Sequence, residues 1–366
     1  MMDLIAIRDD ASEHEIAAIL RGDALVPSNP ASFVAMALHH RMAPLLVRAG
    51  AAARLPRADA APLFEYARNE AVISELRDRE LRRVLSALRA EGIDVLVMKG
   101  AHLSHSHYPE PYLRPRDDAD LFVARQDRDR VTMALTHAGY EHLPDITGDI
   151  VHGQMSFGRQ KDIRVLLDVH LRIAAPRVAA GLLSFEELQS RSESLPRLGA
   201  RVPTPVDALA LACIHQSAHH PGHRMLLWMY DVYLLLSRFT DAEMEEFSTR
   251  AVEFRMARLC AYVVAASTEY FPVPAARALL DRLNAVGHDE ASAFLVHART
   301  PLTQLASDLA NTSGWTARGR LLLGHLFPPP AYMRKTYGVS SVALLPWLYT
   351  YRIVRGAGRW LRGRAS

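Results

Sequence analysis

The chain has 366 residues, 49% of them hydrophobic and 23% charged, so it can bury a full core and fill two or three domains or subdomains. Its 43 basic and 40 acidic residues leave a net charge of +3, which is too small to indicate a nucleic-acid partner by itself. No apolar run predicts a transmembrane helix, and residues 1–15 lack the basic stretch and apolar run of a secretory signal. Cys213 and Cys260 fall within apolar helical patterns, so we interpret them as core residues in a reducing compartment and expect a cytoplasmic protein.

Residues 1–90 have the periodicity of helices, because apolar side chains recur every three or four positions. Ser12, with Glu15 three positions later, has the pattern of a capping box and predicts the start of the first helix. A second helix is expected over residues 31–49 and a long third helix over residues 62–91.

The next stretch combines a buried strand, a glycine and a short helix. Gly92 predicts the end of the long helix. Residues 94–98 are an apolar run with β-branched members, which predicts a strand that ends in a turn at Lys99 and Gly100. Residues 101–108 can form a short helix, which two prolines then close.

A second strand is predicted over residues 118–123. Alternate side chains on a strand share a face, so Asp118 and Asp120 project to the same side. Two neighbouring carboxylates repel each other unless a cation lies between them, and Mg²⁺ typically uses one or two protein carboxylates together with water and substrate phosphates. The pair therefore favours a metal site for phosphoryl or nucleotidyl chemistry. The alternative is that the two acids merely begin a strand at the protein surface.

Beyond this strand, residues 127–138 predict a helix and residues 153–173 predict a β-hairpin. On the second strand of the hairpin, Asp168 and His170 share one face, and apolar side chains occupy the other. Asp168 thus presents a third carboxylate in a setting that otherwise favours apolar residues.

Asp168 needs a partner if it is buried in that strand. An ion pair with an arginine, such as Arg114 or Arg172, would supply one. A metal ion shared with Asp118 and Asp120 is the alternative. The residues alone leave both possibilities open.

The chain from residue 203 onward is again helical. Thr204 before Pro205 predicts a capped helix start, and Thr240 with Glu243 has the pattern of a capping box. Further helices are expected over 223–237, 255–270 and 273–283. Residues 347–362 mix aromatic residues with arginines, a composition suited to a membrane surface or nucleic acid, but we favour a final amphipathic helix that closes the bundle.

Histidines occur in two groups. The first lies in the predicted short helix and the second lies around a predicted helix end; they comprise His102, His105 and His107, and His215, His219, His220 and His223. A zinc site is conceivable at His215 and His219, which are four positions apart on a helix. No cysteine or glutamate completes a zinc motif, so we interpret these residues as ordinary surface and cleft histidines.

Two stretches together resemble a known family. KGAHLSHSHYPEPYLRPRDDADLFV followed by LLDVHLRI is similar to uncharacterised bacterial nucleotidyltransferases of the polymerase-beta superfamily, which show KG, then RxxxDxDLLV, then a DLHWR-like strand. RPRDDAD also resembles the R-x-H-D-D-x-D stretch of aminoglycoside nucleotidyltransferases. Residues 215–231 and 326–338 resemble the family's helical segment with a His and WxxD and its FP-x-x-x-Y tail.

The resemblance implies roles for particular residues. Asp118 and Asp120 would ligate Mg²⁺ or Mn²⁺, with Asp168 as the third carboxylate. Gly100 would lie where relatives have a turn against the triphosphate, although Ala101 replaces the usual serine or glycine. Backbone N–H groups at the helix start could still hold phosphate. The remaining nucleotide contacts would be Lys99, Ser104 and Arg114, with His102 or His170 touching phosphate or acceptor.

The sequence thus predicts an α+β protein with a small mixed sheet of nucleotidyltransferase connectivity, flanked by helical regions. The expected division is an N-terminal helical region over 1–90, the α/β core over 91–175 and a C-terminal helical region over 176–366. The expected activity is transfer of a nucleoside monophosphate from an NTP to an unknown acceptor with release of pyrophosphate. The alternatives are a nucleotide-binding regulator without turnover and a toxin or natural-product tailoring enzyme that acts on a macromolecule.

Overall fold

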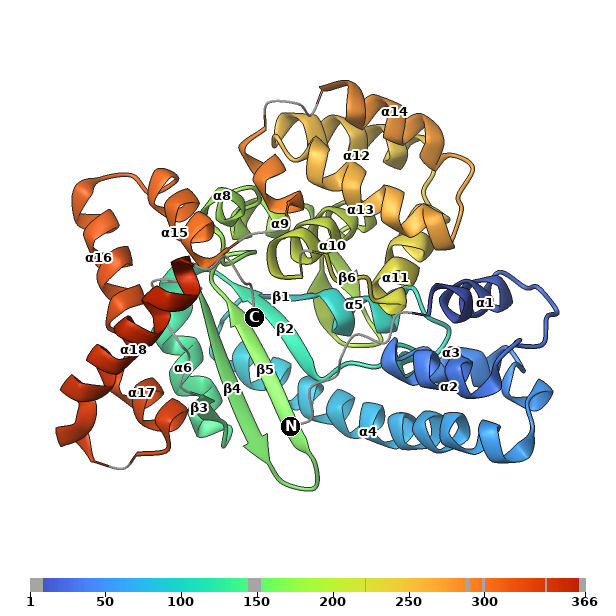
Figure 1. Ribbon diagram of the computed structural model, residues 1–366, viewed down its shortest axis with the longest axis horizontal. Helices are drawn as coiled ribbons and strands as arrows, with labels where there is room; N and C mark the ends of the chain where they lie inside the picture. The colour runs from blue at the N-terminus through green and yellow to red at the C-terminus, as the bar shows by residue number, and fades with distance from the viewer. Residues whose placement is uncertain are drawn as a thin grey trace.

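The computed structural model describes residues 9–143, 153–220, 222–286, 290–297, 300–339 and 341–361. Within them the chain is an α+β protein in which a mixed sheet lies between helical segments at both ends, as predicted (Figure 1). The sheet has seven strands in the order β3-β4-β5-β2-β1-β7-β6. The strands are β1 (Val95–Met98), β2 (Asp118–Val123), β3 (Glu141–Leu143), β4 (Gln154–Gln160), β5 (Arg164–His170), β6 (Glu193–Leu195) and β7 (Ala200–Val202).

Helices cover both faces of this sheet. The α-helices are α1 (Asp10–Leu20), α2 (Pro30–His39), α3 (Ala43–Arg48), α4 (Arg57–Ala90), α5 (Lys99–Ser106), α6 (Arg128–His137), α8 (Arg177–Ala180), α9 (Phe185–Arg191), α10 (Pro205–His219), α11 (Leu226–Leu236), α12 (Asp241–Glu253), α13 (Ala257–Tyr270), α14 (Ala276–Val286), α15 (Pro301–Ala310), α16 (Trp315–Leu326), α17 (Pro330–Tyr337) and α18 (Leu345–Leu361). Short 3-10 helices are η1 (Ala52–Arg54), η2 (Pro111–Leu113), η3 (Arg125–Asp127), η5 (Ala291–Val296) and η6 (Val342–Leu344).

Strand β2 divides the core into two sides. Its odd-numbered residues, such as Leu121, pack with apolar side chains of α4 and α6 in one buried cluster. On the other side Phe122 joins Leu96 and Met98 of β1 in a second cluster, which is built mainly from α10 to α14 (Figure 1). The alternation expected from the sequence is therefore present. Asp118 and Asp120 lie on the second side, toward the C-terminal helices.

Two expectations for the N-terminal helices are wrong. Helix α1 begins at Asp10 rather than at Ser12, because the Asp9 side chain accepts the backbone N–H of Ser12 at 3.4 Å and acts as the cap. The single helix expected over 31–49 is two helices, α2 and α3. The break between them lies at Arg41, whose φ of +59° no α-helix accommodates.

The predicted start of the long helix is also wrong, since α4 begins at Arg57 and runs through Pro62. Its predicted end is confirmed, because Gly92 follows it with a φ of +64°. The hairpin expected over 153–173 is confirmed as β4 and β5.

The C-terminal helical region predicted over 176–366 also contributes two strands. β7 pairs in parallel with β1 through Leu96 and Arg201, and β6 pairs with β7. The predicted caps of α10 and α12 are confirmed: Thr204 accepts from the backbone N–H of Asp207, and Thr240 forms a capping box with Glu243. Both cysteines lie in the buried core, as expected.

The final helix does not close the helical bundle as expected. Leu345 and Leu348 of α18 pack with Met333 of α17 in a small separate cluster. Helix α18 also continues to Leu361 and is not frayed after Gly356. In the part of the chain that the structure describes, none of the helices combines the length and the apolar character that crossing a membrane requires.

Candidate active site

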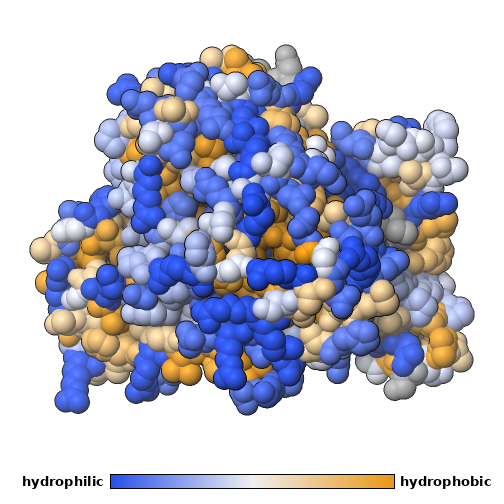
Figure 2. Space-filling view, turned by 180° about the vertical axis from the view of Figure 1, so that it is seen from behind, coloured by the Kyte–Doolittle hydropathy of each residue, from blue (hydrophilic) through white to orange (hydrophobic). Residues whose placement is uncertain are grey.

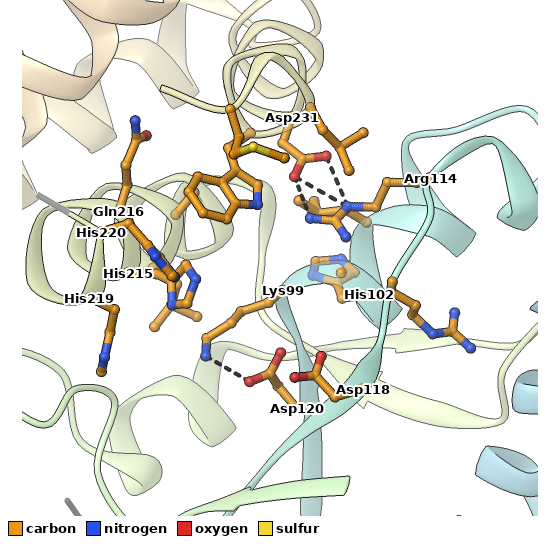
Figure 3. Close-up of a pocket in the computed structure, with 18 of the residues that line it drawn as sticks. Lys99, His102, Arg114, Asp118, Asp120, His215, Gln216, His219, His220 and Asp231 are labelled. Carbon is orange, nitrogen blue, oxygen red and sulfur yellow. Dashed lines mark hydrogen bonds and ion pairs between the residues drawn. The ribbon is translucent and has the colours of Figure 1, made fainter. Parts of the chain in front are cut away.

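A pocket of about 560 Å³ lies between the sheet and the C-terminal helices. One wall consists of the junction of β1 with α5, the start of β2 and part of β5. The opposite wall consists of α10 and α11, which approach from the other side of the pocket (Figure 3). Both the α/β core and the helices α10 and α11 therefore line the pocket.

The three carboxylates predicted from the sequence all line this pocket. β2 and β5 are parallel, with Asp120 directly opposite Asp168 and Asp118 two positions before Asp120. All three side chains therefore lie on the same face of the sheet. Burial, together with the negative charges of Asp120 and Asp168, raises the pKa of Asp118 to about 7. A cation in this place would relieve the repulsion.

Asp120 is held by two partners. Lys99 Nζ lies 2.7 Å from its Oδ1 (Figure 3), and His170 Nε2 lies 2.7 Å from the same oxygen. Burial alone would raise the pKa of Asp120, but the Lys99 ammonium and the hydrogen bond to His170 hold it well below its usual range. Asp120 is therefore ionised at neutral pH.

Asp168 is held differently from Asp120. Burial raises the pKa of its carboxyl group, which accepts a hydrogen bond from the Ser156 hydroxyl at 2.7 Å. Among the described residues Asp168 has no ion pair with an arginine, and Arg114 pairs with Asp231 instead. The arginine partner considered from the sequence is thus not formed at Arg114.

Lys99 and Gly100 form the turn of chain beside these carboxylates. The sequence predicted a turn at these two residues and a helix from residue 101, but α5 already begins at Lys99 and includes both. Lys99 has a φ of +50°, a left-handed conformation that is costly for a residue with a side chain and is found where the surroundings enforce it. No side chain caps the start of α5. The first N–H groups of this helix therefore remain available for an anion.

Arg114, expected to contact phosphate, lines the pocket but is engaged by another residue. Its Nη2 and Nε bind the carboxylate of Asp231 at 2.6 and 3.1 Å (Figure 3). The hydroxyl of Tyr108 donates to the same carboxylate at 2.8 Å. This ion pair joins the core to α11, and Asp231 fixes where the Arg114 guanidinium lies.

Ser104, also expected to contact phosphate, is fully buried and does not line the pocket. Its hydroxyl donates to the carbonyl of Ala101 at 3.1 Å and accepts from Arg116 Nη1 at 3.3 Å. Arg116 in turn pairs with buried Asp78 of α4, which also contacts His105 at 3.1 Å. Ser104 is therefore part of a buried network that anchors α5 to α4.

The two histidines singled out from the sequence differ in place. His102 lines the pocket, where burial and the nearby His107 and His105 lower its pKa to about 3, and its Nδ1 has no hydrogen-bond partner among the described residues. His170 does not line the pocket; it holds Asp120 from the adjacent strand. A neutral His102 can offer or accept one hydrogen bond inside the pocket.

The α10 and α11 wall contains functional candidates that the sequence analysis did not assign to the site. The rings of His220 and Trp228 lie 4.4 Å apart, and His215 packs against both. Gln216 lines the same wall, and within the described part of the chain its buried Oε1 has no hydrogen-bond partner. The sequence signals were the histidine pair on one helix face and the single acid, Asp231, in an otherwise apolar helix.

The donor set suits a hard cation. In the described ranges no three histidine, cysteine or acidic side chains are already arranged to hold a metal ion. Mg²⁺ does not need three, because it commonly takes one or two carboxylates and completes its shell with water and phosphate oxygens. Asp118 and Asp120 supply that pair of oxygen ligands on one strand. Lys99 would have to share Asp120 with the ion or move to the substrate.

Comparison with known families completes the description. A search of curated proteins finds no match to this chain. The family model for "Uncharacterised nucleotidyltransferase" matches residues 27–272, which contain the whole sheet and every residue that lines the pocket. Since the match covers more than half of the chain, this protein belongs to that family of nucleotidyltransferases.

Proposed function

We propose that the protein transfers a nucleoside monophosphate from an NTP to an acceptor hydroxyl or similar group, with Mg²⁺ or Mn²⁺, and releases pyrophosphate. The observation that carries this proposal is the meeting of Asp118, Asp120 and Asp168 on one wall of a pocket, beside Lys99 and an uncapped helix start. Acidic residues without a cation would repel one another there. Family membership supports the same class of reaction.

The triphosphate would lie at the start of α5. The N–H groups beside Gly100 would donate hydrogen bonds to phosphate oxygens, and the helix dipole favours the negative charge. Lys99 would add one positive charge if its ammonium turned from Asp120 to a phosphate. Arg114 would contribute through its field rather than by a bidentate contact, because Asp231 occupies its guanidinium.

The reaction needs positioning and charge compensation more than a protein nucleophile. Mg²⁺ or Mn²⁺ held by Asp118 and Asp120 would neutralise charge on the phosphates. The acceptor oxygen would form a bond to the α-phosphorus as the bond from that phosphorus to the bridging oxygen breaks. Pyrophosphate leaves with the bonding pair. Asp168, whose pKa is raised by burial, would receive the acceptor's proton.

The nucleobase or an aromatic acceptor would occupy the α10 and α11 wall. Trp228 and His220 supply a flat surface, and stacking on aromatic side chains contributes about 1 to 3 kcal/mol per base in single-stranded nucleic-acid complexes. Gln216 and His102 offer polar atoms that have no partner in the described structure, and these could select among bases.

Two observations support a second function. The Lys99 ammonium already neutralises Asp120, and Ala101 replaces the serine or glycine found in relatives. A protein with this arrangement could bind a nucleotide without turning it over and act as a regulator. Binding without transfer would identify this case.

Calorimetric titration with each of the four common NTPs tests the binding that both functions require. We expect heat of binding for at least one NTP in Mg²⁺ and little or none in EDTA. Asp118→Asn should weaken the metal-dependent part, whereas Asp162→Asn, an acid in the loop between β4 and β5 outside the pocket, should not. Failure of all four NTPs to bind with Mg²⁺ or Mn²⁺ would refute the proposal.

A further inference from the structure

The last part of the chain concentrates exposed hydrophobic side chains. The described residues include 17 large hydrophobic side chains that are exposed, and ten of these lie between Trp315 and Val354. Figure 2 shows one face of the molecule, on which hydrophilic and hydrophobic side chains are mixed and hydrophobic ones reach the surface in several places. Scattered apolar residues need no explanation, but a contiguous group indicates a contact surface.

Helix α18 carries apolar residues on its buried side and also on its exposed side. Leu345 and Leu348 point inward to the small cluster with Met333. Trp347, Tyr351 and Val354 are spaced by four and three positions, so they share one side of the helix. Their exposed fractions are 63%, 37% and 69%.

A surface can be defined from these residues. Leu344 ends η6 just before α18 and is 47% exposed, and it continues the spacing of the three side chains on the helix. We call Leu344, Trp347, Tyr351 and Val354 the C-terminal stripe. The rings of Trp347 and Tyr351 stack with centroids 5.3 Å apart, which makes the middle of the stripe one flat apolar area.

The C-terminal segment that carries the stripe has charged side chains of one sign. Residues 309–366 contain nine lysines and arginines and no aspartate or glutamate. Of these, Arg320 and Arg334 are exposed on α16 and α17. The partner that this charge attracts must be anionic.

We propose that the C-terminal stripe docks on a lipid bilayer that carries anionic headgroups. Trp and Tyr are suited to the boundary between headgroups and acyl chains, and the aliphatic Leu344 and Val354 would enter the acyl region. Basic residues of the same C-terminal segment would meet the lipid phosphates, each adding about 1 kcal/mol of attraction. The inference does not depend on the activity proposed above.

Two other partners, a second copy of the chain and nucleic acid, fit the C-terminal stripe less well. A second copy of the chain would bring two basic surfaces together, and like charges repel. Nucleic acid would satisfy the arginines and could stack on Trp347, but it offers no apolar environment for Leu344 or Val354. A bilayer satisfies both the charge and the aliphatic side chains.

Docking in this place would leave the pocket open. None of α15 to α18 lines the pocket, and the stripe lies outside residues 27–272, the part that the family model matches. Helices α15 to α18 gather at one side of the molecule in Figure 1, away from α10 and α11. The core could therefore act on a substrate at the membrane surface.

Co-sedimentation of the full chain with vesicles tests the proposal. We expect binding to vesicles of phosphatidylcholine mixed with phosphatidylglycerol, and little binding to phosphatidylcholine alone. Trp347→Ser with Val354→Ser should lower the partition coefficient at least about tenfold, since two exposed anchors are lost. Arg320→Gln with Arg334→Gln should lower it about fivefold per arginine and reduce its dependence on salt.

Matched controls separate docking from folding. Val72→Ser with Val252→Ser removes two exposed valines on α4 and α12, and it should leave vesicle binding unchanged. Equal binding to both kinds of vesicle, no binding, or equal loss in this control would overturn the proposal. A dimer that Trp347→Ser with Val354→Ser converts to a monomer would instead assign the surface to a second copy. Tighter binding of a single-stranded oligonucleotide than of vesicles would assign it to nucleic acid.

Discussion

The ammonium nitrogen of Lys99 lies 2.7 Å from Oδ1 of Asp120, inside the pocket where β1 ends and α5 begins. This ion pair makes the two acids of β2 unlike each other. Lys99 and His170 lie beside Asp120 and lower the pKa of its carboxyl group. Asp118 forms no ion pair among the described residues, and its pKa is raised to about 7 by burial and by the neighbouring carboxylates. Neutralising each acid should therefore have opposite effects on stability.

Asp118→Asn should stabilise the metal-free protein. The folded protein holds a proton on Asp118 more tightly than the unfolded chain, so wild-type stability falls as the pH rises from about 4 to about 7. The variant lacks this penalty. Its advantage should be small near pH 4, grow to pH 7 and stay constant above, reaching on the order of 2 to 4 kcal/mol. Urea denaturation in EDTA at several pH values measures it, and a variant less stable than wild type at pH 8 would contradict the electrostatic account.

Asp120→Asn should destabilise the metal-free protein. The change leaves the largely buried Lys99 ammonium, with a side chain only 13% exposed, without its counter-charge. Removing one partner of such a pair costs about 3 kcal/mol. Lys99→Met with Asp120→Asn removes both charges and should recover much of the loss. If the double variant is no more stable than Asp120→Asn, the ion pair is not the cause.

Asp231→Ala should cost about 3 to 5 kcal/mol, because it strands the buried Arg114 guanidinium and leaves the Tyr108 hydroxyl without its acceptor. Arg114→Met with Asp231→Leu replaces the pair by apolar side chains and should restore most of the stability. Thermal and urea denaturation check both variants. Equal stability of wild type and Asp231→Ala would show that α11 is joined to the core by other contacts.

Gly100→Ala tests the close approach of Arg114 to the start of α5. A Cβ at this position would overlap Arg114 Nη1, which Asp231 prevents from moving freely. We expect a shift of Arg114 and weaker NTP binding, seen by calorimetry, with the helix retained because alanine favours helices. Gly319→Ala in α16, where a Cβ would meet nothing, is the matched control. Unchanged affinity in Gly100→Ala would remove this glycine from the binding site.

Local signals predicted much of the core. The alternation in β2 and β5 placed Asp118, Asp120 and Asp168 on one face, and the structure brings all three to the pocket. The caps of α10 and α12 were also predictable, since each depends on side chains three residues apart. These features require only the order of residues along one element.

Features that depend on distant partners were not predictable. The sequence placed Ser104 beside the expected phosphate turn. In the structure its hydroxyl accepts from Arg116, which pairs with Asp78 of the distant helix α4. β6 and β7 have three residues each, too few to show alternation, and they exist because β1 offers an edge for pairing. The engagement of Arg114 by Asp231 joins residues 117 positions apart.

Transfer of label from NTP tests the central claim most directly. The protein is incubated with Mg²⁺ and an NTP labelled at the α-phosphate or, separately, at the γ-phosphate, with water or a small-molecule pool as acceptor. Nucleotidyl transfer predicts that α-label appears in a new product or in slowly released NMP, that γ-label appears only in pyrophosphate, and that Asp118→Asn and Asp120→Asn abolish both. Movement of γ-label to an acceptor, release of inorganic phosphate, or equal turnover in the two variants would contradict the account. Tight Mg²⁺-dependent NTP binding with no movement of either label would contradict catalysis and leave the nucleotide-binding regulator.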